Sequence, residues 1–316
     1  MQAVLSVPVD PREPLELARW DQLLDDLSPL LLNPTASPDF FSDISVQASR
    51  LVQCVRDDPD LAIFQVVHAS PDKVKHYGVI HSIHTATLMC LIAVRKGWNA
   101  TYTAGAVKAA LTMNLSIIAL QTTLAQQPTP LTPDQRIAID RHPHDSADLL
   151  ERLYVDDEHW LRAVRQHHER PDGKGYPNHL TEVTQWADAL RTCDVFGAKV
   201  SPRISRSGML LPQAAEAIFR QRSSGYFGAS IIRELGLYPP GCLVSLSSGE
   251  TALVVRRTAS PMHPEVALLT SAQGAALAAP VRCLTGQLQG RTIEGAAANA
   301  DLSNLFSPQR LFDPSL

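Results

Sequence analysis

The stretch HHERPDGKGYP, residues 167–177, decides how this sequence is interpreted. Two adjacent histidines, His167 and His168, are followed by an acidic residue and a Gly-rich turn that closes with Gly175-Tyr176-Pro177. Neighbouring side chains diverge by about 100° around a helix, so both imidazoles can bind one ion only where the helix ends or is distorted. An ordinary turn would explain the glycines and the proline, but it would not explain the whole string. The stretch therefore predicts the end of a helix and a candidate metal site.

The surrounding residues, 71–236, carry helical signals, and Gly and Pro cluster only at 171–177. Thr132-Pro133 predicts the start of a helix that runs towards Leu153. One apolar face follows from the helical spacing of Val107, Leu111, Leu115 and Ile118. We therefore expect a helical bundle that is interrupted by one conspicuous loop.

Residues 1–70 are also predicted to be helical. Ser37-Pro38 is typical of a helix start. Asp58 to Asp60 is expected to end this helix and to begin a short next one. Within the first helix one face is formed by Ile44, Ala48, Leu51 and Val55. The N-terminal helices are expected to pack on the bundle, to mediate a homodimer, or both.

The C-terminal part has the pattern of a β structure. In CLVSLSSGETALVVRR, residues 242–257, two β-rich runs flank Ser248-Gly249, which predicts a hairpin. PEVALLTSAQGAALAAPVRCL, residues 264–284, repeats the pattern. The predicted organisation is an N-terminal helical region (1–70), a helical domain (71–237), a small antiparallel β module (238–290) and a poorly ordered tail (291–316).

Composition excludes several classes of protein. The 316 residues carry a net charge of −4 and no basic stripe, so nucleic acid is not expected as a partner. The five cysteines are scattered without CxxC spacing, as in a reduced cytoplasmic protein. Neither a signal peptide nor an uninterrupted apolar run of about 18 residues is evident, so no membrane span is expected.

The string at 167–177 resembles the HD-GYP family, because it matches the signature HHExxDGxGYP at every specified position. The resemblance covers residues of about 70–240. It implies a mainly α, HD-type helical bundle and kinship with metal-dependent phosphodiesterases that hydrolyse cyclic di-GMP. The residues that match the family's GYP loop are Asp172, Gly173, Gly175, Tyr176 and Pro177.

Further segments resemble the family's metal-binding segments. YGVIHSIHTA implies His81 as the first ligand, whereas His84 is expected to support the site indirectly or to be structural. RHPHDSADLL implies His142, and CDVFGAKVSPRISR implies Asp194. The implied ligands are thus His81, His142, His167, His168 and Asp194. Substrate phosphate would be contacted by Arg203 and Arg206, whose guanidinium groups can fork onto phosphate oxygens, with Tyr176 also implied on the substrate side.

One segment departs from the family. Where relatives read roughly ALLHDIGK, this chain reads ALTMNLSI, residues 110–117. Met113 stands at the His position, Asn114 at the Asp position and Ile117 at the Lys position. The dipeptide His144-Asp145 does not replace the pair, because it lies in the segment that already supplies His142. The stretch TMNLSIIAL itself is expected to form a buried helix.

The three replacements affect the chemistry. An amide bridges two cations poorly, a thioether suits Mn or Fe(II) poorly, and an alkyl chain cannot stabilise charge on a phosphoryl group. The first metal position, with His81 and Asp194, is expected to be empty. The second, with His142, His167 and His168, could hold a single Fe, Mn or Zn ion, or no metal.

Two functions from different classes follow, beside a purely structural bundle. The first is a catalytically impaired signalling module that senses cyclic di-GMP or docks a protein partner through the GYP loop or the β module. The alternative is an active phosphodiesterase or phosphohydrolase that uses one metal on the three histidines. The replacements at Met113, Asn114 and Ile117 favour the first.

Overall fold

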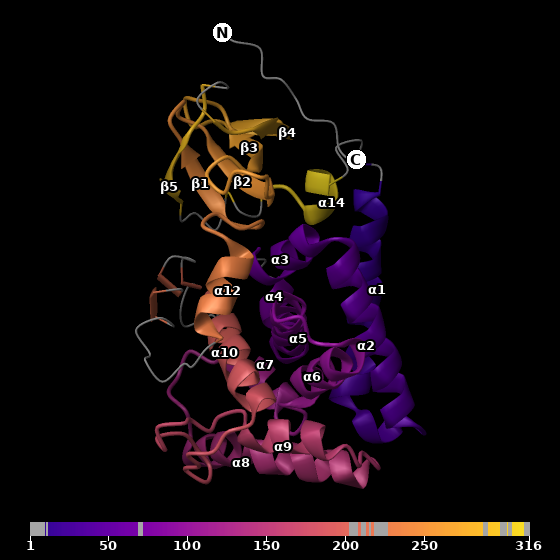
Figure 1. Ribbon diagram of the computed structural model, residues 1–316. Helices are drawn as coiled ribbons and strands as arrows, with labels where there is room; N and C mark the ends of the chain where they lie inside the picture. Colours follow the sequence, from indigo (N-terminus) through magenta and orange to yellow (C-terminus); the bar gives the residue numbers. More distant parts are fainter. Residues whose placement is uncertain are drawn as a thin grey trace. The chain divides into compact units, whose positions relative to one another are not determined.

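The computed structural model is mainly α, with a small C-terminal sheet, which confirms the predicted fold class (Figure 1). It describes residues 10, 12–68, 72–201, 208–209, 213–214, 216–217, 227–286, 290–297, 302 and 305–312. The helices are α1 (Glu13–Leu32), η1 (Pro34–Ala36), α2 (Phe40–Asp57), α3 (Pro59–Val67), α4 (Asp72–Lys75), α5 (Tyr77–Arg95), α6 (Ala100–Thr112), α7 (Ile118–Gln126), α8 (Pro133–Arg152), α9 (Glu158–Gln166), α10 (Gln185–Val200), α12 (Gly228–Leu235) and α14 (Pro308–Phe312). The strands are β1 (Leu243–Leu246), β2 (Thr251–Arg256), β3 (Glu265–Thr270), β4 (Ala276–Leu284) and β5 (Ile293–Ala296).

The chain forms two compact units. The helical unit comprises Gln22–Asp57 and Pro71–Glu234, and the other unit comprises Met1–Asp21, Asp58–Ser70 and Leu235–Leu316. The first 70 residues therefore contribute to both units, whereas the sequence suggested one N-terminal region. The reason is electrostatic in part: Glu13 pairs with Arg256 and Arg282 in one unit, and Asp26 pairs with Arg50 in the other.

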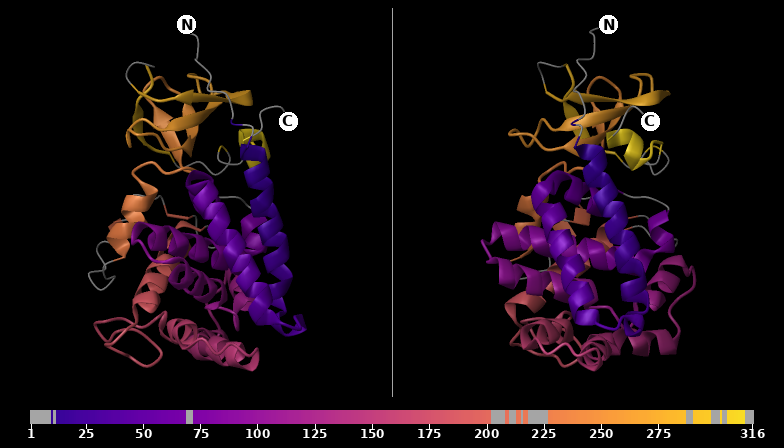
Figure 2. Two further views of the ribbon diagram at one scale, coloured as in Figure 1. Left: turned by 45° about the vertical axis from the view of Figure 1, so that its right-hand side comes forward. Right: turned by 90° about the vertical axis from the view of Figure 1, so that its right-hand side faces the viewer.

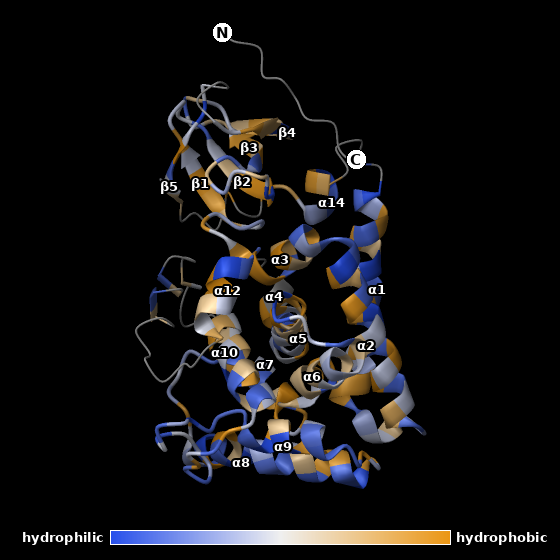
Figure 3. Cartoon of the chain, viewed as in Figure 1, coloured by the Kyte–Doolittle hydropathy of each residue, from blue (hydrophilic) through white to orange (hydrophobic). Residues whose placement is uncertain are grey.

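Helix α5 forms the core of the helical unit. It is long and apolar enough to cross a membrane, but 89% of its apolar window is buried inside the protein, as expected of a central helix. Figure 3 shows hydrophobic residues gathered on α5 and hydrophilic residues on α8 and α9. The predicted face of α2, from Ile44 to Val55, is buried against this core.

The predicted start signals are largely confirmed. Thr132 and Gln135 form a capping box at the start of α8, with Pro133 in its first turn. Asp58 caps α3 by accepting a hydrogen bond from the backbone of Leu61. Helix α2 begins at Phe40, slightly later than Ser37-Pro38 suggested, after Asp39 has accepted a hydrogen bond from the backbone of Ser42.

The prediction of one helix through TMNLSIIAL was wrong. Helix α6 ends at Thr112 and α7 begins at Ile118, with turns between them. The backbone of Ile117 donates to the carbonyl of Asn114, and Ser116 bonds through its backbone and hydroxyl to the hydroxyl of Ser146 on α8. The bonds to Ser146, thirty residues further along the chain, fasten this turn to α8, so the interruption of the helix depends on tertiary contacts.

The β module is one antiparallel sheet with the order β4-β3-β2-β1-β5, and Figure 2 shows its strands curling around a common core. The hairpin at Ser248-Gly249 is confirmed, since β1 pairs with β2 around it and Gly249 adopts a φ of +99°.

Two predictions about the C-terminus were wrong. The module extends beyond residue 290, because β5 pairs with β1, placing Val244 opposite Ala296. The tail is also not wholly irregular, because α14 buries Leu311 and Phe312. Strand β1 would otherwise leave backbone N–H and C=O groups unpaired along its edge, and β5 pairs with them. Burial of the two large apolar side chains stabilises α14.

Candidate metal centre

Three histidines converge in the helical unit. His142 lies within α8, His167 directly follows α9, and His168 is the next residue. One ring nitrogen from each lies within 4.8 Å of the others. The end of α9 thus provides the break that lets two adjacent imidazoles point to one place, as the sequence required.

Backbone carbonyls orient two of these rings. His142 Nδ1 lies 2.5 Å from the carbonyl oxygen of Ile139, and His167 Nδ1 lies 2.6 Å from that of Val164. Because a carbonyl can only accept a hydrogen bond, Nδ1 carries the proton in both rings and each Nε2 presents a lone pair. The two Nε2 atoms lie 3.0 Å apart. Two lone pairs facing each other repel unless a cation lies among them, so the donor set fits a metal ion.

The histidines are held neutral, as metal ligands must be. Burial lowers the pKa of His142 to about 3, with a smaller effect from His167. Burial also lowers the pKa of His167, and it lowers that of His168 well below the usual value. The ring of His168 stacks on Tyr176 with centroids 4.5 Å apart, so the GYP tyrosine covers one face of this ligand.

The other two predicted ligands bond to each other. His81 Nε2 lies 2.7 Å from Asp194 Oδ1, and both side chains are buried. Burial would raise the pKa of the Asp194 carboxyl, but the hydrogen bond from His81 and the neighbouring histidines hold it well below its usual range. The second carboxylate oxygen, Oδ2, lies 4.0 Å from His168 Nδ1. Asp194 thus connects His81 with the three-histidine cluster.

The three replaced positions are all buried. Met113 and Asn114 are at most 1% exposed, and Ile117 is 7% exposed. The Nδ2 atom of Asn114 has no hydrogen-bond partner among the residues that the structure describes. Ser116, between them, is bonded to α8 through Ser146, one helical turn after His142.

The GYP loop is held in place by hydrogen bonds to Glu169. This fully buried carboxylate accepts hydrogen bonds from the backbones of Asn178, at 2.6 Å, and Leu180, at 3.0 Å. Gly175 is required by space, because a Cβ there would lie 2.4 Å from the backbone nitrogen of Arg170. Gly173 adopts a φ of +68°, which favours glycine. The loop is therefore specified by its own residues, and exposed Asp172 pairs with Arg170 at its outer side.

The remaining predicted residues lie elsewhere. Arg203 and Arg206 fall outside the described residues. His84 is buried on α5, and half-buried His144 bonds to Asn178. Sequence reasoning overlooked Arg191, a buried cation 3.8 Å from Asp188. The spacing of Asp188, Arg191 and Asp194, three residues apart on α10, was the available signal.

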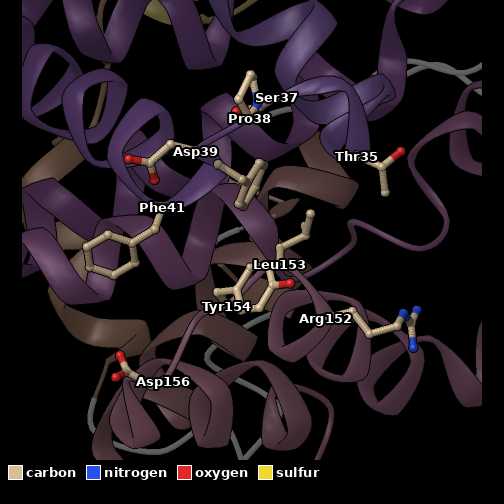
Figure 4. A pocket seen from close by; sticks show the side chains of 10 residues that line it. Thr35, Ser37, Pro38, Asp39, Phe41, Arg152, Leu153, Tyr154 and Asp156 are labelled. Carbon is tan, nitrogen blue, oxygen red and sulfur yellow. The ribbon is translucent and has the colours of Figure 1, made fainter.

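A separate cavity of about 430 Å³ opens between the start of α2 and the end of α8 (Figure 4). Phe41, Arg152 and Tyr154 are among its lining residues, and Tyr154 is 91% exposed with a φ of +62°. Among the described residues, none that was predicted to bind metal or substrate lines this cavity.

Comparisons with known proteins agree with this geometry. A family model described as HD domain matches residues 66–231. The chain is 30% identical over 211 residues to the cyclic di-GMP phosphodiesterase PA4108 of Pseudomonas aeruginosa, and the alignment covers 62% of this chain. It spans only about half of that relative, 49% of its length. Among solved structures, the fold resembles Bd1817, an HDG"Y"P protein from Bdellovibrio bacteriovorus, with a TM-score of 0.54, 16% identity and coverage of 68% of this chain and 69% of that one.

Proposed function

We propose that this chain, which belongs to the HD domain family and is an HD-GYP member, binds one divalent metal and recognises cyclic di-GMP without cleaving it by a two-metal mechanism. The observation that carries the proposal is the convergence of His142, His167 and His168 within 4.8 Å, in a chain that has Met113 and Asn114 where the family has its His-Asp pair. Of the groups for a first metal only His81 and Asp194 remain, and the bridging carboxylate is replaced by the amide of Asn114.

The residues that would hold the metal are His142, His167 and His168. Their neutral rings, two of which have Nδ1 bonded to a carbonyl, suit Zn or Fe better than Mg or Ca. When bound, such an ion supplies a positive charge and an open position for water or a phosphate oxygen. The chain itself holds the rings in place and covers one of them with Tyr176.

Hydrolysis is expected to be impaired for three chemical reasons. Asn114 cannot bridge two cations as a carboxylate does, and Met113 offers a thioether in place of an imidazole. Ile117 leaves no ammonium group to stabilise charge on the phosphoryl oxygens. We therefore place the protein among binding or signalling modules that respond to the cyclic dinucleotide.

The dinucleotide itself is proposed from the relative, because PA4108 is a cyclic di-GMP phosphodiesterase and the shared segment includes the metal-centre region. A signalling role in the cytoplasm, with a protein partner at the GYP loop or the β module, fits such a module. Self-association into a homodimer belongs to the same proposal.

A paired measurement on the purified full chain tests the proposal. Metal content is determined by elemental analysis, cyclic di-GMP binding by calorimetric titration, and cleavage by chromatography of the products. We expect about one equivalent of metal, measurable binding and no turnover. Two equivalents of metal with turnover, or no binding of the dinucleotide, would overturn it.

The convergence of three imidazoles also supports a second candidate, a phosphodiesterase or phosphohydrolase with a single metal. Three histidines and one open position are sufficient for catalysis in some zinc enzymes. Turnover that disappears in His168→Ala, with one equivalent of metal in the wild type, would establish this candidate in place of the first.

A further inference from the structure

Asp194 occupies an unusual position between two histidines. Its Oδ1 accepts the proton of His81 Nε2 at 2.7 Å, because a buried ionised carboxylate can only accept. Its Oδ2 lies 4.0 Å from His168 Nδ1, which is longer than a hydrogen bond. Both oxygens are thus directed at imidazole nitrogens of the protein.

The three histidines of the cluster share one pattern. Nδ1 faces the carbonyl of Ile139 in His142, the carbonyl of Val164 in His167 and the carboxylate of Asp194 in His168. In each ring Nε2 is the other nitrogen, on the opposite side from this partner. Hydrogen-bonded partners fix the orientation of metal-binding histidines and raise their basicity, as the carbonyls do for His142 and His167. Asp194, at 4.0 Å, acts on His168 through its charge.

Charge gives Asp194 a second role. Three neutral imidazoles do not offset the charge of a divalent ion, and a buried uncompensated charge is costly. His142, His167 and His168 are largely buried, so solvent offers little compensation. The Asp194 carboxylate is an anionic group close to the cluster, with Oδ2 4.0 Å from His168 Nδ1.

We infer that Asp194 positions His168 and offsets the charge of the metal without binding it, and that His81 in turn holds Asp194. This inference rests on the proposed single-metal site. It assigns to Asp194 and His81 a role different from that of ligands, because these two groups, without the family's His-Asp pair, are too few to hold a first ion.

The test uses the full chain freed of metal and reloaded with Co²⁺, whose visible spectrum reports the ligand set. Asp194→Asn is nearly isosteric; it removes the charge and keeps one oxygen that can accept the hydrogen bond from His81. We expect it to keep one equivalent of Co²⁺ with an unchanged band position, while the affinity falls by roughly 10- to 100-fold. Thermal unfolding confirms that the variant is folded.

Two comparisons sharpen the result. Asp188→Asn, on the same helix, changes the charge equally but lies 3.8 Å from Arg191 and outside the cluster, so its affinity is expected to match the wild type. His81→Gln retains a donor for Asp194 and is expected to stay within about threefold of wild-type affinity, because the orienting contact survives.

The inference is overturned if Asp194→Asn shifts the Co²⁺ band or loses an equivalent of metal, since that would identify Asp194 as a ligand. It is equally overturned if Asp194→Asn binds Co²⁺ as tightly as Asp188→Asn. Failure of the proposed function would look different, because the wild-type protein would then bind two equivalents or fail to bind the dinucleotide.

Discussion

The Nε2 atoms of His142 and His167 lie 3.0 Å apart while both Nδ1 protons are donated to backbone carbonyls of the preceding helical turn. The first ring comes from α8 and the second from the residue that follows α9, and each ring is oriented by a carbonyl of the adjoining helix. The fold itself thus sets the orientation of both rings, which lowers the cost of ordering the ligands.

The first prediction concerns these ligands. His167→Ala removes one of three imidazoles, and we expect metal affinity to fall by at least roughly 100-fold, because the remaining two leave the ion underligated. Elemental analysis after dialysis measures the loss. His144→Ala is the matched control: this half-buried histidine lies on α8 but bonds to Asn178 and is not part of the cluster, so metal content should stay unchanged. Equal loss in both variants would contradict the assignment.

The second prediction concerns restoration. Met113→His with Asn114→Asp and Ile117→Lys returns the three missing groups, and we expect a second equivalent of metal and measurable cleavage of cyclic di-GMP. The His81–Asp194 hydrogen bond must give way for the second ion to bind. Elemental analysis measures the metal content, and chromatography of the products measures cleavage. A folded triple variant that takes up no additional metal would show that residues 110–117 are not the segment we aligned.

The third prediction concerns pH. In the metal-free protein His142 has a pKa of about 3, lowered chiefly by burial, against 6.5 for an ordinary histidine. Below pH 6.5 the unfolded chain therefore binds more protons than the folded one, so stability falls as the pH drops. Between pH 7 and 5 this residue alone should reduce the free energy of unfolding by about 2 kcal/mol. Urea titrations at both values measure the loss, which should be smaller in His142→Asn; an equal loss would be contrary to expectation.

The fourth prediction concerns the GYP loop. Gly175→Ala places a Cβ 2.4 Å from the backbone nitrogen of Arg170, and backbone cannot move aside as a flexible side chain can. We expect a loss of stability of roughly 1–3 kcal/mol, with weaker metal binding because Tyr176 and His168 adjoin this residue. Gly295→Ala, where a Cβ meets nothing within 4 Å, is the control and should unfold at nearly the wild-type temperature. Wild-type stability and metal binding in Gly175→Ala would contradict this prediction, because the loop would then accommodate the extra Cβ.

Local chemistry was sufficient for much of the fold. Capping residues such as Thr132 and Asp58 act on the backbone within a few positions, so the starts of α8 and α3 could be predicted from the sequence. The apolar face of α2 and the hairpin at Ser248-Gly249 follow from short periodicities in the same way. The turn at 113–117 escaped prediction because it depends on Ser146, thirty residues away.

The sequence by itself determined the family string at 167–177 and the loss of the His-Asp pair, since both depend only on which residues are present. Only the tertiary structure decided which of the predicted ligands contact each other. His81 and Asp194, 113 residues apart, form a hydrogen bond, and Nε2 of His142 lies 3.0 Å from Nε2 of His167. The physical reason is that the interacting groups lie far apart along the chain. A side chain's identity is a local property, but its partner and its protonated nitrogen are set by groups that folding brings within a few ångströms.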